Sequence, residues 1–186
     1  MQMKRIIILV VFGFIGMQQS AQSAELPRRF GVSLKAGAGQ YFTNYGTQFT
    51  VGGDFTYRLS EPFEVGLGYL TSHLSEVRTS TILGNTLAIE RIHFVFFKGD
   101  FRPVASAREF WVGARAGLSI LASSTGLVNS SLSTSYATHF LLGAAAGYDY
   151  AIHPQVVLGG EINTLYAFRP NRMTLLNALL SVKYLF

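Results

Sequence analysis

The stretch that decides the fold is 110–120, which reads FWVGARAGLSI. Apolar side chains stand at every second position from Phe110 to Ile120, and Trp, Gly, Arg or Ser stands between them. A period of two is typical of a β-strand whose two faces meet different surroundings. The stretch therefore predicts a strand with one apolar face and one face that places Trp111 and Arg115 among glycines.

The same alternation recurs along the chain and predicts eight strands of about ten residues each. The predicted segments are 30–41, 49–59, 63–69, 91–96, 110–120, 139–150, 156–163 and 176–186. The fourth is the least regular, and for it we predict that Ile92, Phe94 and Phe96 lie on the apolar face, with a bulge nearby.

Composition agrees with a membrane protein built from strands. The chain is 49% hydrophobic and 13% charged, whereas soluble domains carry about 25% charged residues. After residue 15 no apolar run approaches the roughly 18 residues of a membrane helix, which excludes a helical bundle. The 15 Phe, 9 Tyr and 19 Gly with only 5 Pro favour an all-β fold.

Charge and cysteine content exclude several function classes. The net charge is +5, but the basic residues are scattered, so no nucleic-acid-binding face is expected. The chain has no Cys, which excludes disulfides, a lipid-anchored start and a thiol nucleophile.

The first 23 residues are typical of a secretory signal peptide. Lys4 and Arg5 precede a short apolar core at 6–15, and Ala21 and Ser23 provide the small residues that flank a cleavage site. We therefore predict a signal peptide at 1–23 and one exported domain at 24–186.

Two architectures share the alternation, a soluble sandwich and a membrane barrel. The predicted joins alternate in length, with short ones near 60–62, 102–108 and 151–154 and longer ones near 43–47, 75–86, 123–135 and 169–172. Aromatic residues gather near both sets of joins, as in the two interfacial girdles of a membrane barrel. These features favour an all-β, eight-stranded antiparallel up-and-down transmembrane β-barrel.

The polar faces would then fill a lumen just wide enough for side chains. Buried charges must be paired, and hairpin spacing places Lys35 near Asp54 and Arg58 opposite Glu64. We expect a closed lumen with a charge network; an ion path or a small-molecule site is the alternative. The predicted members are Lys35, Asp54, Arg58, Glu64, Arg115, Asp149, Glu161 and Lys183.

The last strand alternates up to a C-terminal aromatic residue, through Leu180, Val182, Tyr184 and Phe186. This pattern resembles the assembly signal of bacterial outer-membrane barrels. The whole mature chain resembles the small barrel family typified by the OmpA transmembrane domain and OmpX, with OmpW as a variant.

The resemblance implies location in the bacterial outer membrane, with both termini in the periplasm and long loops at the cell surface. It implies insertion by the barrel-assembly machinery with periplasmic chaperones, and contact with outer-membrane lipid and lipopolysaccharide. It implies no single activity, because this architecture supports many functions.

Motifs for catalysis or cofactors are weak. Gly37 and Gly39 lack the third glycine of a phosphate loop, and His73, His93, His139 and His153 lack metal-ligand spacing. We therefore expect no cofactor and no metal.

One set of residues, His73, Ser75 and Glu90, is predicted on the lipid-facing side of the third and fourth strands, with Glu90 opposite Thr71. Its His-x-Ser spacing resembles the PagL family of lipid A deacylases, but in that family the motif lies on the penultimate strand, where 161–165 has neither His nor Ser. We predict that the protein is not an enzyme.

The sequence thus favours a structural or surface-interaction role without turnover, for a ligand that the sequence does not identify. An OmpW-like small-solute channel and a deacylase are the alternatives.

Because Ala21 and Ser23 best flank a cut, we expect the mature protein to begin at Ala24. N-terminal sequencing of protein isolated from outer membranes measures this directly. A start at Met1 would contradict the predicted export.

Overall fold

The computed structural model describes residues 29–42, 46–81, 84–104, 107–127, 133–169 and 173–186. The predicted signal peptide and cleavage site lie outside these residues. Eight strands follow in order: β1 (Phe30–Tyr41), β2 (Gly46–Arg58), β3 (Phe63–Thr81), β4 (Gly84–Phe101), β5 (Phe110–Leu127), β6 (Ser133–His153), β7 (Val156–Ala167) and β8 (Met173–Leu185). The predicted all-β class is confirmed. No helix long and apolar enough to cross a membrane occurs among the described residues.

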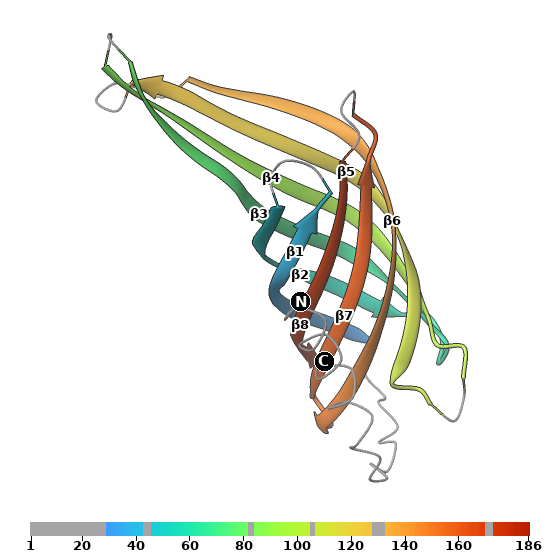
Figure 1. Cartoon of the computed structure of the whole chain (residues 1–186). Coiled ribbons are helices and arrows are strands. Elements are labelled where there is room, and N and C mark those ends of the chain that lie inside the picture. Colours follow the sequence, from blue (N-terminus) through green and yellow to red (C-terminus); the bar gives the residue numbers. More distant parts are fainter. Residues whose placement is uncertain (1–28, 43–45, 82–83, 105–106, 128–132, 170–172) are drawn as a thin grey trace, which may run out of the picture.

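The strands form one closed antiparallel barrel in which each strand pairs with its neighbour in sequence and β8 pairs with β1 (Figure 1). Reciprocal backbone hydrogen bonds between Phe30 and Phe186, of 3.3 and 3.0 Å, fasten the closing seam. Closure satisfies the backbone groups of every wall strand within the sheet, which a strand in hydrocarbon requires.

The strand pairing also fixes the tilt of the barrel. A path of paired residues that starts at residue 31 of β1 returns to β1 at residue 41, an offset of 10 residues around eight strands. The path runs through Gly31, Thr56, Gly66, Lys98, Arg115, Gly143, Leu165, Leu175 and Tyr41. Such an offset requires strongly tilted strands, typically by about 35–45°, and all the residues on the path have the inward parity.

Side chains alternate between the outer wall and the lumen. Outward Leu34 and Leu180 are 73% and 67% exposed, whereas Lys35 and Leu179 beside them are buried. The exposed apolar wall is the surface that contacts lipid in a transmembrane barrel.

The predicted orientation of the fourth strand is wrong. Ile92, Phe94 and Phe96 point into the lumen and are buried, while Val95 and Phe97 face outward. Both faces of this strand are apolar here, so a period of two cannot tell inside from outside.

Glycines on both sides make room for the inward Phe96. It pairs with Gly68 of β3 and Gly117 of β5. A Cβ atom on Gly68 would lie 2.2 Å from the Phe96 ring, so the neighbouring strands can accommodate this ring only where a side chain is missing.

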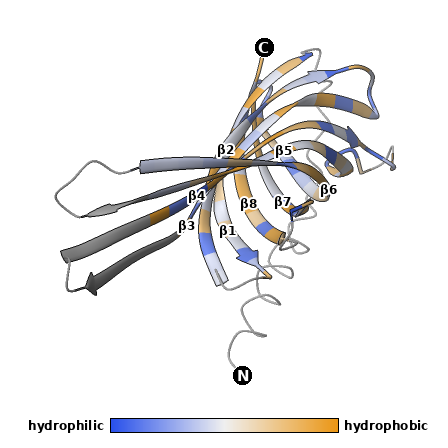
Figure 2. Ribbon diagram, turned by 90° about the horizontal axis from the view of Figure 1, so that it is seen from above, coloured by the Kyte–Doolittle hydropathy of each residue, from blue (hydrophilic) through white to orange (hydrophobic). Residues whose placement is uncertain are grey.

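Four strands are much longer than the others. β3, β4, β5 and β6 contain 19, 18, 18 and 21 residues, whereas β1, β2, β7 and β8 contain 12 or 13. Pairing of β3 with β2 ends at Ser72 and pairing of β6 with β7 ends at Leu141, yet β3–β6 remain paired with one another beyond these points. We call this extension the protruding sheet; it leaves the barrel at the end opposite the C-terminus (Figures 1 and 2).

The ladder between β3 and β4 contains a register shift between His73 and Ser75. The irregularity therefore lies on β3 and not on the fourth strand. The shift moves Ser75 opposite Glu90 and continues the hairpin to Thr81 and Gly84.

Candidate functional site

The lumen contains the most unusual chemistry of the described residues, a cluster of buried charges. Four cations and four anions point inward, and none is more than 8% exposed. They are Lys35, Lys98, Arg115 and Lys183, with Asp54, Glu64, Asp100 and Glu161. Their formal charges cancel, which is the condition under which charges can be kept away from water at moderate cost.

Lys98 lies at the centre of this network. Its Nζ is 3.0 Å from Asp54 Oδ2 and 2.8 Å from Asp100 Oδ2. Asp54 also pairs with Lys35 at 2.6 Å, and Arg115 pairs with Asp100 at 2.5 Å. Residues from β1, β2, β4 and β5 are thereby linked across the lumen.

Glu161 of β7 extends the network to the other side of the barrel. It pairs with Lys35 and lies 3.8 Å from Arg115. Asn163 donates to Glu161 Oε1 at 2.7 Å, and Asn177 donates to Asn163 at 2.7 Å. Charged and amide groups thus form a continuous hydrogen-bonded chain between opposite walls.

Trp111 packs against the cations of the network. Its ring lies 5.5 Å from Lys98 Nζ and 5.4 Å from Arg115 Cζ, within the range of cation–π attraction. Trp111 Nε1 donates to Asp149 Oδ1 at 3.2 Å, and Asp149 pairs with Arg102 at 2.9 Å. A Cβ atom on Gly147 would lie 2.4 Å from the indole, so this inward glycine provides the space for the ring.

The structure brings together most of the predicted charge network. Lys35, Asp54, Arg115, Glu161 and, through Glu64, Lys183 are linked by ion pairs to the Lys98 cluster. Asp149 lies beside it, joined through Trp111 and Arg102.

Arg58 occupies its predicted position but does not form the predicted ion pair. It lies opposite Glu64 in the β2–β3 ladder. Among the described residues, however, the ion pairs of Glu64 run to Lys183 at 2.7 Å, to Arg102 at 3.9 Å and to Lys98 at 4.0 Å. A cross-barrel pair with Lys183 and longer contacts with Lys98 and Arg102 therefore replace the expected pair with Arg58.

Sequence reasoning missed Lys98, Asp100 and Arg102. All three have the same parity as Phe94 and Phe96, so the reversed orientation of β4 hid them. One signal could have revealed them: in 98–102 the charged residues alternate with Gly and Phe at a period of two, which places all three on one face.

The half of the lumen farther from the termini is mostly apolar, with the hydrogen-bonded Thr50, Ser72 and Asn177 buried among its side chains, which corrects the prediction of a lumen lined by charges throughout. On β3 the inward side chains change from Glu64 to Leu70 and Leu74, and on β7 they change from Glu161 to Leu165. The apolar cluster comprises Tyr41, Leu70, Leu74, Ile92, Phe94, Phe96, Leu141, Leu165, Ala167, Met173, Leu175 and Leu179. These side chains pack against one another in this part of the lumen.

The residues considered for hydrolysis are not arranged as predicted. Thr71 lies opposite His93, and Glu90 lies opposite Ser75. Glu90 has the parity of the inward Ile92, whereas His73 is exposed on the outer wall. The side chain of Ser75 lies outside the described residues. Among the described residues, no three His, Cys, Asp or Glu side chains could hold a metal ion.

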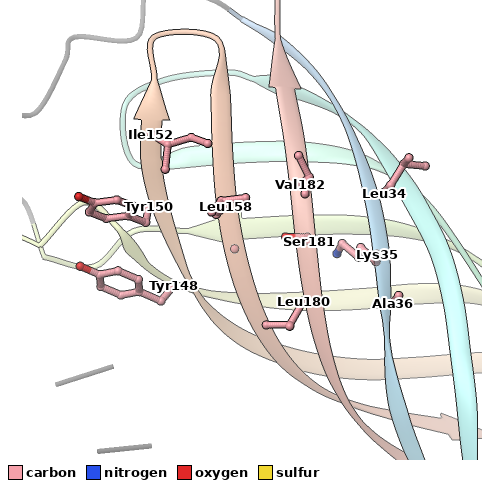
Figure 3. Close-up of a pocket in the computed structure, with 11 residues that line it drawn as sticks. Leu34, Lys35, Ala36, Tyr148, Tyr150, Ile152, Leu158, Leu180, Ser181 and Val182 are labelled. Atoms are coloured by element: carbon pink, nitrogen blue, oxygen red, sulfur yellow. The ribbon is translucent and has the colours of Figure 1, made fainter. Parts of the chain in front are cut away.

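A recess of about 700 Å³ lies on the outer wall across β6, β7, β8 and β1 (Figure 3). Its walls include the exposed side chains of Tyr148, Tyr150, Leu180 and Leu34. Eight of its eleven lining residues have the lipid-facing parity, and Lys35, Gly159 and Ser181 have the inward parity, so the recess opens on the apolar outer surface of the wall.

The residues of the predicted assembly signal all face outward. Leu180, Val182, Tyr184 and Phe186 are exposed, and Phe186 stacks on Phe30 and Tyr184 with centroid separations of 6.1 and 6.4 Å. Their recognition by the assembly machinery stays a prediction.

An apolar outer wall, a closed ring of eight strands and buried, paired charges define a transmembrane β-barrel. Residues 7–186 match the family model of the outer membrane protein beta-barrel domain. The chain belongs to this family and is a protein of the bacterial outer membrane.

Solved structures show the same fold. Neisserial surface protein A is 17% identical with a TM-score of 0.63, over 84% of this chain and 97% of that one. Ail of Yersinia pestis, solved with the heparin analogue sucrose octasulfate, is 10% identical with a TM-score of 0.63, over 86% and 99%. A major outer membrane protein from Thermus thermophilus is 13% identical with a TM-score of 0.60, over 86% and 100%. No curated protein matches the chain.

The ion pairs predict unequal effects of removing two cations near Glu64. Lys183→Ala removes the nearest partner of a buried carboxylate, so we expect the free energy of unfolding to fall by about 3 kcal/mol. Arg58→Ala removes no ion pair of Glu64 and should cost about 1 kcal/mol or less. Urea titration of both variants refolded in the same micelles measures the difference.

The double variant Lys183→Ala/Glu64→Gln serves as the control, because it also removes the excess buried negative charge that Lys183→Ala leaves. It should be more stable than Lys183→Ala alone. Equal losses for Lys183→Ala and Arg58→Ala would contradict the assignment of partners.

Proposed function

We propose that this protein is a closed barrel without enzymatic turnover, which holds the protruding sheet beyond the membrane as a surface for binding an extended peptide segment of another protein. The observation that carries this proposal is the continuation of β3–β6 past the ends of the neighbouring strands. A sheet that leaves the barrel in this way has two edges that the barrel does not pair.

The edge formed by β6 is described in most detail. Phe168 donates its N–H to the carbonyl of Phe140 at 2.9 Å, so Phe140 presents its backbone groups toward β7. Backbone groups in a strand alternate sides, and therefore Thr138, Tyr136 and Thr134 present theirs to the same side. β7 ends at Ala167 and supplies no strand partner to these three.

The chemistry of this edge favours backbone pairing. Residues 133–140 include no Lys, Arg, Asp, Glu or Pro, the residues that commonly protect exposed edges. Tyr136 is 72% exposed, and a hydrogen bond of 2.9 Å between Ser124 and Thr134 holds the edge against β5. An extended segment could add here as a further strand, with Tyr136 as an apolar contact.

The side chains inside the barrel support a binding role over solute transport, and the composition of the β6 edge indicates the class of ligand. The balanced charges and the apolar cluster occupy the lumen, which supports a closed barrel over a channel. Ail was solved with a sulfated heparin analogue, but residues 133–140 of this chain include no Lys or Arg with which to bind sulfate. The β6 edge therefore fits a peptide better than a sulfated polysaccharide.

Proline at an edge position tests the proposal, because it removes the N–H that a bound strand needs. Bacteria that carry the protein should attach to a panel of immobilised extracellular proteins more than bacteria without it. Tyr136→Pro or Thr138→Pro should reduce this attachment several-fold at equal surface levels.

Thr138→Ala keeps the N–H and serves as the matched control, for which we expect attachment close to that of the parent. Equal attachment of the proline variants and the parent would contradict pairing at the β6 edge. Equal attachment with and without the protein would contradict the binding role itself.

A further inference from the structure

Among the described side chains of the outer wall, the band of apolar residues is interrupted on β3 and β4. On most strands, exposed aromatic residues such as Phe49, Phe140 and Phe168 mark the end of the band away from the termini. On β3 and β4 the band ends earlier, at Tyr69 and Val95, which pair with each other in the ladder.

Polar and basic residues occupy the wall directly beyond this pair. Thr71 lies opposite His93, and His73 lies opposite Arg91. His73 and Arg91 are exposed and His93 is half-buried, and all have the outward parity. Directly opposite residues on one face of a sheet have Cβ atoms about 5 Å apart, so the three basic side chains form one cluster.

The Tyr69 hydroxyl holds one histidine in place. Its oxygen lies 2.7 Å from His93 Nδ1, and the two rings stack with a centroid separation of 6.0 Å. Because Tyr69 occupies Nδ1, Nε2 is the ring nitrogen that remains for a ligand.

Within the described side chains, no carboxylate pairs with the positive charge of the cluster. Among the described residues, neither Arg91 nor His73 forms an ion pair, whereas the buried lysines and arginines of the lumen all do. Of the two acids nearest in sequence, Glu90 has the parity of the inward Ile92, and the side chain of Glu76 lies outside the described residues. The guanidinium of Arg91 is always charged. At the edge of a lipid-facing wall, an anion in the headgroup layer would stabilise this charge.

We propose that Tyr69, His73, Arg91 and His93 form a binding site for the phosphate of a glycolipid headgroup in the outer leaflet. Arg91 supplies a planar, charged donor that suits a phosphate, and the histidines supply further N–H donors. The acyl chains of the same lipid would lie along the wall below, against Val95 and Phe97, which is 70% exposed.

A lipid fits better than a soluble anion because the basic cluster joins the apolar wall without interruption. The cluster lies at the end of the barrel away from the termini. With both termini in the periplasm, this end lies in the outer leaflet. The site does not depend on the binding role of the protruding sheet, and it acts on a different class of ligand.

Lipid retention provides the test. The full-length mature protein is refolded into phosphatidylcholine nanodiscs that contain diphosphoryl lipid A, chemically dephosphorylated lipid A or phosphatidylglycerol. The barrel is then extracted into mild detergent, and bound lipids are counted by native mass spectrometry. We expect about tenfold more retained diphosphoryl lipid A than dephosphorylated lipid A.

The variant His73→Gln/Arg91→Gln/His93→Gln should lower retention of diphosphoryl lipid A to the level of the dephosphorylated lipid. Arg91→Gln alone, which changes one exposed side chain, should give an intermediate loss and provides a second variant if the triple one does not refold. Arg108→Gln is the matched control, because it removes an exposed arginine that pairs with Glu61 outside the cluster. It should retain lipid A like the parent.

Equal retention of phosphorylated and dephosphorylated lipid A would overturn the proposal. Unchanged retention in the Arg91 variants would also overturn it, as would an equal loss in Arg108→Gln. Retention of phosphatidylglycerol equal to that of diphosphoryl lipid A would show that any anionic lipid suffices and would overturn the assignment to a glycolipid.

Discussion

Removal of charge from water inside a narrow barrel is the constraint on which the rest of the structure depends. Eight strands with a register offset of 10 leave an interior that side chains alone can fill. Each buried cation there must lie against a carboxylate, and Lys98 contacts both Asp54 and Asp100. Other pairs, such as Lys183 of β8 with Glu64 of β3, join strands that are not neighbours in the sheet, so the network ties separate parts of the wall together.

The charged and apolar parts of the lumen contribute differently. Breaking a buried ion pair is costly, so the network opposes changes of register among the strands it joins. The apolar cluster adds dispersion and burial and separates the charges from the surface end of the barrel. A base of this kind can hold long hairpins in a fixed direction, which is what the extension of β3–β6 requires.

Much of this architecture could be predicted from the sequence, for identifiable physical reasons. A strand such as Phe110–Leu127, with apolar residues on one face and Gly, Arg and Trp on the other, has only one stable orientation in a membrane barrel. β4 could not be oriented in this way, because Phe94 and Phe97 have opposite parity and are equally apolar. The neighbouring strands determine the orientation of β4, because their inward glycines Gly68 and Gly117 leave space for the Phe96 ring.

The burial of the charged side chains was easier to predict from the sequence than the ion pairs that they form. Spacing within a hairpin predicts neighbours across one ladder, such as Arg58 and Glu64. In a closed barrel a long side chain can also cross the lumen, and Lys183 of β8 reaches Glu64 of β3 in this way. Such contacts depend on the closure and tilt of the whole barrel, which no local pattern encodes. The same holds for the basic cluster, whose parity became clear only with the orientation of β4.

Ion conductance tests most directly whether the lumen is closed. The refolded protein is inserted into planar lipid bilayers in concentrated potassium chloride, insertion is verified by recovery of the folded protein, and a porin serves as the conducting control. A filled lumen predicts a current that stays at the baseline of the protein-free bilayer. Discrete conductance steps from the parent protein would contradict a sealed interior.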